Sequence, residues 1–153
     1  MSFKSIKKEK LIDDSRNESL NSVMQERQQL IEKGVKHPSG FIIHDMDDRL
    51  TTIITILPGT AVNEKAIEFQ EFVLDKIDRG RKNIIIEMAS CRIIESTFLG
   101  AMVIAQRKVG GVDGHFRIVV DKNLETSRLI FTDLDKIFKT YYSLSEAMNG
   151  LGE

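Results

Sequence analysis

The first forty residues differ in their hydrophobic pattern from the rest of the chain. Polar residues dominate this stretch, and its few apolar positions have the spacing of one narrow helical face. These positions are Leu20, Val23, Met24, Leu30 and Ile31. Such a stripe predicts a helix that is marginal alone and leans on the main domain or on a partner. Glycine and proline at 34, 38 and 40 predict a linker, and the lysine-rich first ten residues predict a disordered tail.

After Gly40 the pattern changes to short segments of strand and helix character. Runs rich in β-branched residues at 41–45 and 50–57 flank a polar turn and predict an antiparallel hairpin. Helical periodicity follows over 63–79, where the core positions are Ala66, Phe69, Val73 and Ile77. Gly80 is the expected helix stop, and the apolar run 83–88 predicts an interior strand.

The remaining segments continue the alternation. A helix is expected at 96–109, with Leu99, Met102, Val103 and Gln106 in sequence, and a glycine-rich turn at 110–114 leads to a strand at 115–120. Further helices are expected at 124–131 and 143–151, with a short strand at 136–142 between them. The alternation predicts an α/β domain over residues 41–153, with helices packed on one sheet, after a partly helical polar extension, residues 1–40.

Composition narrows the class of protein. The 153 residues are 41% hydrophobic and 29% charged, which fits one globular domain, and the net charge of -1 argues against a nucleic-acid binder. The chain shows neither a secretory signal nor an apolar run long enough for membrane insertion. With a single cysteine it fits a reducing compartment, so a cytoplasmic protein is expected.

Motifs for catalysis, metals and cofactors are missing from the sequence. The three histidines have no metal-ligand spacing, and no phosphate-binding, dinucleotide-binding or serine-elbow motif occurs. Cys91 has no basic residue placed by a motif to lower its pKa, which favours a structural thiol. We therefore expect a protein that is not an enzyme and that uses neither a metal nor a cofactor.

The most informative segment is 91–103, where an apolar approach leads to Glu95, Ser96 and Thr97 at the start of a helix. A hydroxyl at a helix entry is a preferred N-cap, and this interpretation alone accounts for one of the two. A phosphoryl group here would also be tolerated by the positive end of the helix dipole while adding negative charge to an exposed corner. Capping and regulation both remain open on physical grounds.

These residues carry a family resemblance. The stretch Glu95-Ser96-Thr97-Phe98-Leu99-Gly100 resembles the Asp-Ser-Ser-Gly-Leu-Gly signature of the STAS domain of bacterial anti-anti-sigma factors (anti-sigma factor antagonists). Residues 129–138 resemble the family's late Leu-x-x-Thr-Gly-Leu-x-x-x-Phe pattern, and 142–147 resemble its closing helix entry. The resemblance covers roughly three-quarters of the chain, from about Phe41 onward. It implies a mixed sheet with helices mainly on one face.

The function that the resemblance implies is partner switching. The unmodified protein would bind an anti-sigma factor, itself a serine kinase of GHKL type, and so release a sigma factor. The kinase would phosphorylate Ser96, with Thr97 as the second candidate, and a PP2C-like phosphatase would reverse the reaction. The implied partner-binding residues are Glu95, Ser96, Thr97, Phe98, Gly100, Gly59 and Thr60.

The chain departs from the family pattern at specific positions. Glu95 replaces the signature aspartate, Phe98 replaces a glycine and is expected to be partly exposed, and Gly59-Thr60 keeps a family glycine without the acid that follows it. The changes at Glu95 and Phe98, together with the N-terminal helix, also suit an alternative, a STAS adaptor of a larger complex, a stressosome or a lipid-transport ATPase, that is not phosphorylated. The extension is either a solvated tail with a frayed helix or a contact with a partner or a second copy in a homodimer.

Overall fold

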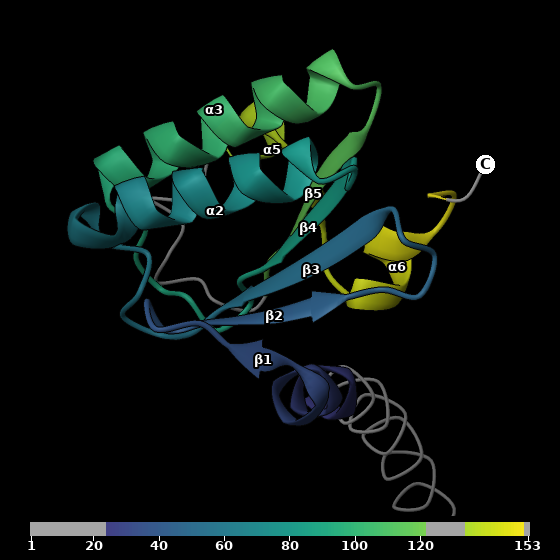
Figure 1. Cartoon of the computed structure of the whole chain (residues 1–153). Helices are drawn as coiled ribbons and strands as arrows, with labels where there is room; N and C mark the ends of the chain where they lie inside the picture. The colour runs from purple at the N-terminus through teal and green to yellow at the C-terminus, as the bar shows by residue number, and fades with distance from the viewer. Residues whose placement is uncertain (1–23, 122–133, 152–153) are drawn as a thin grey trace, which may run out of the picture.

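A six-stranded sheet forms the centre of the domain in the computed structural model, which describes residues 24–121 and 134–151 (Figure 1). The strands follow the order of the chain across the sheet. They are β1 (Val35–Lys36), β2 (Phe41–Asp45), β3 (Thr51–Ile56), β4 (Asn83–Glu87), β5 (His115–Val119) and β6 (Lys139–Tyr141). The first three strands pair antiparallel and the last three join in parallel, so the sheet is mixed as expected.

Helices cover both faces of this sheet unequally. The long helices α2 (Ala66–Asp78) and α3 (Ser96–Gly111) lie side by side on one face, together with the short α5 (Leu134–Ile137) (Figure 1). The other face carries the short α6 (Leu144–Met148) and the helical residues 24–33 (Figure 1). The expected α/β fold with helices mainly on one face is therefore confirmed.

Helix α2 follows the predicted pattern closely. A single 3₁₀ turn, η1 (Asn63–Lys65), precedes it, and its buried residues are the four expected ones: Ala66, Phe69, Val73 and Ile77. Gly80 ends the helix with φ +100°, and its N–H donates to the Ile77 carbonyl while that of Arg81 donates to the Lys76 carbonyl. This pair of bonds is the Schellman arrangement that a glycine after a helix permits.

Strand β4 supplies side chains to two separate hydrophobic cores. Ile84 and Ile86 belong to the core beneath α2 and α3, whereas Ile85 belongs to the core beneath α6 and residues 24–33. All three are fully buried. The continuous apolar run is therefore an interior strand, as predicted, and it is covered on both faces.

The helical residues 24–33 pack on the sheet through an apolar side chain and an ion pair. Leu30 is buried in the second core, while Met24 stays 64% exposed. Arg27 Nε lies 3.3 Å from Glu87 Oε1, a carboxylate with no exposed surface. Burial raises the pKa of Glu87, and the Arg27 guanidinium only partly offsets the rise. Leu20 and Val23 of the predicted stripe lie outside the described residues.

The structure differs from the sequence predictions in several short segments. Val35 and Lys36, expected in a linker, form strand β1, because their backbone pairs with Ile43 and Ile42 of β2. The strand expected at 136–142 starts only at Lys139, since the preceding residues form α5. The disordered tail and the helix expected at 124–131 lie outside the described residues.

Candidate functional site at the start of helix α3

The predicted site residues gather at one edge of the sheet. Strands β3 and β4 are parallel neighbours, so their carboxyl ends meet at the same edge. The chain leaves β3 through Leu57 into a turn that ends at Asn63, and it leaves β4 through a segment that ends at Glu95. Both segments therefore meet at the start of α3, which places Gly59 and Thr60 in the same loop region as Ser96.

Three hydrogen bonds fasten these two segments together. The Glu95 N–H donates to the Ala61 carbonyl at 2.9 Å. The Asn63 N–H donates to Glu95 Oε1 at 2.9 Å, and the Thr97 N–H donates to Asn63 Oδ1 at 3.1 Å. We call the residues Ala61, Asn63, Glu95 and Thr97 the inter-loop clasp. It fixes where α3 begins and satisfies one of the N–H groups that the first turn of a helix leaves free.

The clasp changes the roles predicted for the two hydroxyl residues. Glu95, with extended backbone angles, is the N-cap residue of α3, and Ser96 is the first residue inside the helix. Because Asn63 accepts from the Thr97 N–H, neither hydroxyl caps the helix, so the capping interpretation is wrong. Both Ser96 and Thr97 are exposed. No described residue offers the Ser96 hydroxyl a hydrogen-bond partner, which leaves it open to solvent and to an approaching protein.

The electrostatic setting of Ser96 can tolerate an added phosphoryl group. At the first position of a 16-residue helix, the group lies at the positive end of the macrodipole. Glu95 precedes it, so the corner would gain about 1.5 to 2 negative charges beside an existing carboxylate. The local fold can accept this change while the charge of the outer surface is altered strongly.

Phe98 does not belong to the exposed surface, which corrects the expectation of partial exposure. Its side chain is completely buried. The ring lies 4.7 Å from that of Phe69 on α2 and 6.3 Å from that of Phe41 on β2, measured between ring centroids. Phe98 faces inward because it shares a helix face with Ala101, Met102, Ala105 and Val109, all buried. A direct partner contact through Phe98 is therefore excluded in this structure.

Two glycines of the predicted site have different reasons for being there. Gly59 has φ +80° and follows Pro58 in a turn closed by a hydrogen bond from Thr60 N–H to the Leu57 carbonyl, so the turn itself requires it. Gly100 is exposed on α3, one turn after Ser96, and a Cβ atom there would meet nothing within 4 Å. Packing within the described residues therefore gives no reason for glycine at 100.

An exposed isoleucine was missed by the sequence analysis. Ile93, three residues before Ser96, is 64% exposed, whereas its neighbour Ile94 is buried. The sequence analysis treated Ile93 and Ile94 together, as one apolar segment that leads into the helix. Nothing in that short run distinguishes the two, because only the tertiary position of the segment decides which side chain faces the core.

Cys91 contributes to packing near this site. Its thiol is 1% exposed and lies 3.4 Å from the Ile56 carbonyl. Burial, together with the nearby Glu87 carboxylate, raises the pKa of the thiol to about 12, so the nucleophilic thiolate does not form near neutral pH.

Across residues 24–121 and 134–151, no three His, Cys, Asp or Glu residues are grouped to hold a metal ion. In the same part of the chain, no helix combines the length and apolar character needed to cross a bilayer.

Comparison with known proteins identifies the family. No protein-family model matches the chain. A Thermotoga neapolitana homologue of TM1081, assigned as an anti-sigma factor antagonist, is 30% identical over 98 residues, covering 63% of this chain and 87% of the relative. The crystal structure of TM1081 from Thermotoga maritima, assigned likewise, has a TM-score of 0.58 and 26% identity, covering 74% of this chain and 95% of that one.

A third similarity concerns the fold alone. The anti-sigma factor antagonist SpoIIAA in its unphosphorylated form has a TM-score of 0.58 at 17% identity, covering 72% of this chain and 94% of its own. Together with the mixed sheet and the position of the signature stretch at the start of α3, these matches define the class. The chain belongs to the STAS-domain family of anti-sigma factor antagonists.

Proposed function

We propose that this protein is a partner-switching regulator whose unphosphorylated form binds an anti-sigma factor and thereby releases a sigma factor. The anti-sigma factor is also a serine kinase of GHKL type, and it phosphorylates Ser96, while a PP2C-like phosphatase reverses the reaction. The modification adds charge at the centre of the docking surface and abolishes binding. The observation that carries this proposal is the exposed Ser96 hydroxyl at the first position of α3, which has no hydrogen-bond partner among the described residues.

The surroundings of Ser96 support a docking surface. Gly100 leaves a bare patch of backbone one helical turn away, although glycine inside a helix costs about 0.5–1 kcal/mol relative to alanine. Packing against residues 24–121 and 134–151 does not offset this cost, which supports a role for Gly100 in contact with a partner. Ile93 adds an exposed apolar side chain next to the same corner. A kinase or an anti-sigma factor could therefore approach the hydroxyl closely and bury apolar surface beside it.

The longer acid of the signature also has a place in this proposal. Glu95 uses one carboxylate oxygen to accept from Asn63 and so holds the two loops together. A negative charge beside the modified residue is retained, and the one extra methylene lets the carboxylate reach the neighbouring loop. The substitution of glutamate for aspartate is consistent with a rigid docking corner.

Phosphorylation is tested by intact-mass measurement of the protein isolated from its native cells, followed by peptide mapping. Three versions are compared: the unaltered protein, Ser96→Ala and Thr97→Ala. We expect one added phosphoryl group in the unaltered protein and in Thr97→Ala, and none in Ser96→Ala. Thr97→Ala is the matched control because it removes an adjacent exposed hydroxyl from the same helical turn.

Two outcomes would contradict the assignment. An adduct that persists in Ser96→Ala places the modification on another residue. No adduct under either growth or stress conditions would favour the alternative, a STAS adaptor that docks on a larger complex without being phosphorylated.

A further inference from the structure

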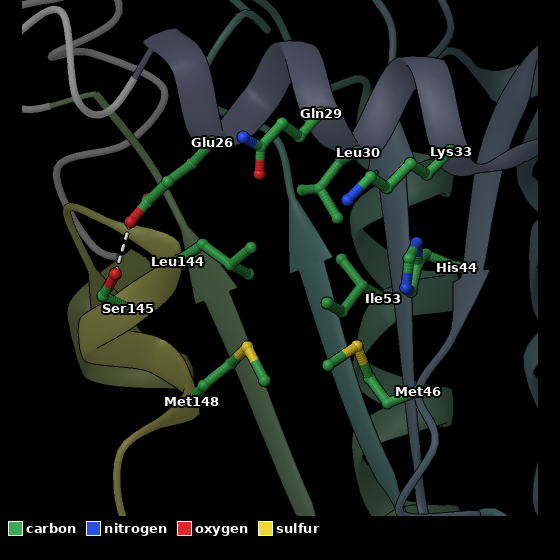
Figure 2. Close-up of a pocket in the computed structure, with 10 residues that line it drawn as sticks. All are labelled: Glu26, Gln29, Leu30, Lys33, His44, Met46, Ile53, Leu144, Ser145 and Met148. Atoms are coloured by element: carbon green, nitrogen blue, oxygen red, sulfur yellow. Dashed lines mark hydrogen bonds between the residues drawn. The ribbon is translucent and has the colours of Figure 1, made fainter.

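Residues 24–33 form a short helix on the sheet face opposite α2 and α3, and we call this helix the strap. Its buried apolar side chain, Leu30, points toward Ile53 of β3 (Figure 2). Glu26 accepts a hydrogen bond from the Ser145 hydroxyl of α6. An open groove of about 180 Å³ remains beside these contacts, between the strap, the sheet and α6 (Figure 2). Because so short a helix is marginal alone, a few contacts decide whether the strap stays docked.

The strap also reaches the carboxylate of Glu87, the last residue of β4. Arg27 Nε lies 3.3 Å from Glu87 Oε1 and 3.4 Å from Glu87 Oε2. The Glu87 side chain has no exposed surface, whereas that of Arg27 is 26% exposed. Removing one partner of a buried ion pair is strongly destabilising, because it leaves a buried charge uncompensated. The ionised Glu87 side chain therefore depends on the strap being in place.

Glu87 Oε1 is shared between the strap and the loop that leads to Ser96. The same oxygen accepts a hydrogen bond of 3.1 Å from the Ala89 N–H. Ala89 is a central residue of a turn, which the Cys91 N–H closes by donating to the Met88 carbonyl. From this turn the chain runs directly to the start of α3. One carboxylate oxygen thus connects the strap with the segment that presents the candidate site.

We propose that docking of the strap, acting through Glu87, holds the loop of residues 88–95 in place before Ser96, and that release of the strap loosens this loop. With the strap docked, Arg27 neutralises the carboxylate, and the carboxylate fixes the Ala89 N–H. With the strap released, the carboxylate loses its cationic partner, water enters around it, and its bond to Ala89 weakens. Glu87 is a positioning residue in this scheme.

The regulatory consequence rests on the function proposed for Ser96. A loosened loop presents the start of α3 in many conformations, and ordering them on binding lowers the affinity for the partner. A signal that draws the strap away from the sheet would then weaken binding without any change at Ser96 itself.

Hydrogen exchange of the full-length protein, followed amide by amide with NMR, tests the coupling without a partner. Arg27→Met removes the guanidinium and keeps an apolar stem, whereas Leu30→Ala shortens the buried side chain of the strap. Each variant should speed exchange at least about tenfold in the strap and at the Ala89 and Cys91 amides, as expected for the loss of one charge-assisted hydrogen bond. The amides of α2 should keep their rates, which separates strap release from global unfolding.

Two further variants provide a rescue and a matched control. Glu87→Gln, added to Arg27→Met, leaves an amide oxygen that accepts from the Ala89 N–H and needs no cation. Slow exchange in the loop should therefore return, even though the strap stays released. Arg79→Met removes an arginine after α2 that is 75% exposed and should change neither segment.

Three results would overturn the proposal. The first is faster exchange in the strap without faster exchange in the loop, or no change in either segment for both strap variants. The second is a double variant whose loop amides stay fast, and the third is an equal effect of Arg79→Met. None of these results depends on phosphorylation of Ser96, so the coupling and the proposed function fail separately.

Discussion

Asn63 and Thr97 are 34 residues apart in the chain and are joined by a hydrogen bond of 3.1 Å from the Thr97 N–H to Asn63 Oδ1. This bond caps α3 from a neighbouring loop, and within residues 24–121 and 134–151 the Ser96 and Thr97 hydroxyls make no hydrogen bond. The start of the helix is therefore tied to the neighbouring loop, while the Ser96 side chain remains accessible. Both properties suit the surface that, on our proposal, a kinase and a binding partner recognise in turn.

Asn63→Ala should destabilise the protein by about 0.5–2 kcal/mol, the usual cost of losing a helix cap. The substitution removes the acceptor for the Thr97 N–H but keeps the Asn63 backbone bond to Glu95. Urea denaturation followed by circular dichroism measures the change. Asn149→Ala, which alters an exposed asparagine after α6, is the control and should have little effect. Equal stability of both variants would show that the bond from the Thr97 N–H to the Asn63 side chain contributes nothing.

Gly100→Ala should raise the stability of the protein while weakening its binding to the partner. The added methyl group meets no atom within 4 Å, so alanine should stabilise α3 by about 0.5–1 kcal/mol. On our proposal the same methyl group obstructs the partner and weakens its binding. Gly110→Ala is the matched control, because it is also exposed on α3 without close neighbours but lies near the far end of the helix. Similar partner affinity of the two variants would argue against Gly100 in the interface.

Phe98→Ala should cost about 3–5 kcal/mol of unfolding free energy, as for other fully buried phenylalanines. The substitution leaves a cavity between Phe69 and Phe41, which thermal or chemical unfolding should register as a large loss. Ile93→Ala, a truncation at an exposed position on the same segment, should change stability by less than about 0.5 kcal/mol. A small effect of Phe98→Ala would mean that the side chain is not buried in solution.

Glu87→Gln should change how stability depends on pH. The pKa of Glu87 is raised by burial above its usual 4.5, so the folded state binds a proton more tightly than the unfolded state does. The corresponding contribution to stability is fully present below pH 4.5 and is lost as the pH rises through the folded pKa. Glutamine stays neutral and avoids this loss. The variant should therefore gain stability relative to the parent between pH 4.5 and pH 8.

The free energy of unfolding is measured for Glu87→Gln and for the parent at pH 4.5 and at pH 8, and the parent's value is subtracted from the variant's at each pH. The pKa of His115 is lowered in the folded state, chiefly by burial. The contribution of His115 to the stability of the protein is therefore lost as the pH falls below 6.5, the usual pKa of histidine. Its contribution is common to both proteins and cancels in the difference. Glu64→Gln, at an exposed glutamate, is the control and should give a flat difference. A difference for Glu87→Gln that is flat, or that falls with pH, would contradict the assigned shift.

The sequence was most informative where local pattern and tertiary environment agree. The core positions of α2 were predicted correctly, because large apolar residues recur there every three or four positions and a glycine follows. For α3 the sequence analysis placed the first core position at Leu99, whereas the buried residues begin one position earlier, at Phe98. Two alanines on the true face carry a weak hydrophobic signal, and exposed Ile104 adds an apolar residue on the wrong face.

Long-range contacts were beyond sequence analysis. Strand β1 has two residues, too few for a periodic signal, and only its pairing with β2 makes it a strand. Glu87 ends an apolar run without any local sign of Arg27, which lies 60 residues earlier. The inter-loop clasp depends in the same way on Asn63 and Glu95 meeting across the edge of the sheet. The sequence did point to the exposed Ser96, whereas the residues that hold its helix in place emerged only from the fold.

On our proposal, charge at Ser96 controls partner binding, and the affinities of Ser96→Ala and Ser96→Asp for the anti-sigma factor decide whether it does. Ser96→Ala should bind about as tightly as the unmodified protein, because the hydroxyl supports no internal contact among the described residues. Ser96→Asp should bind on the order of a hundredfold more weakly, because it introduces a charge at the interface centre. Equal affinities in calorimetry, with both variants folded, would contradict the account.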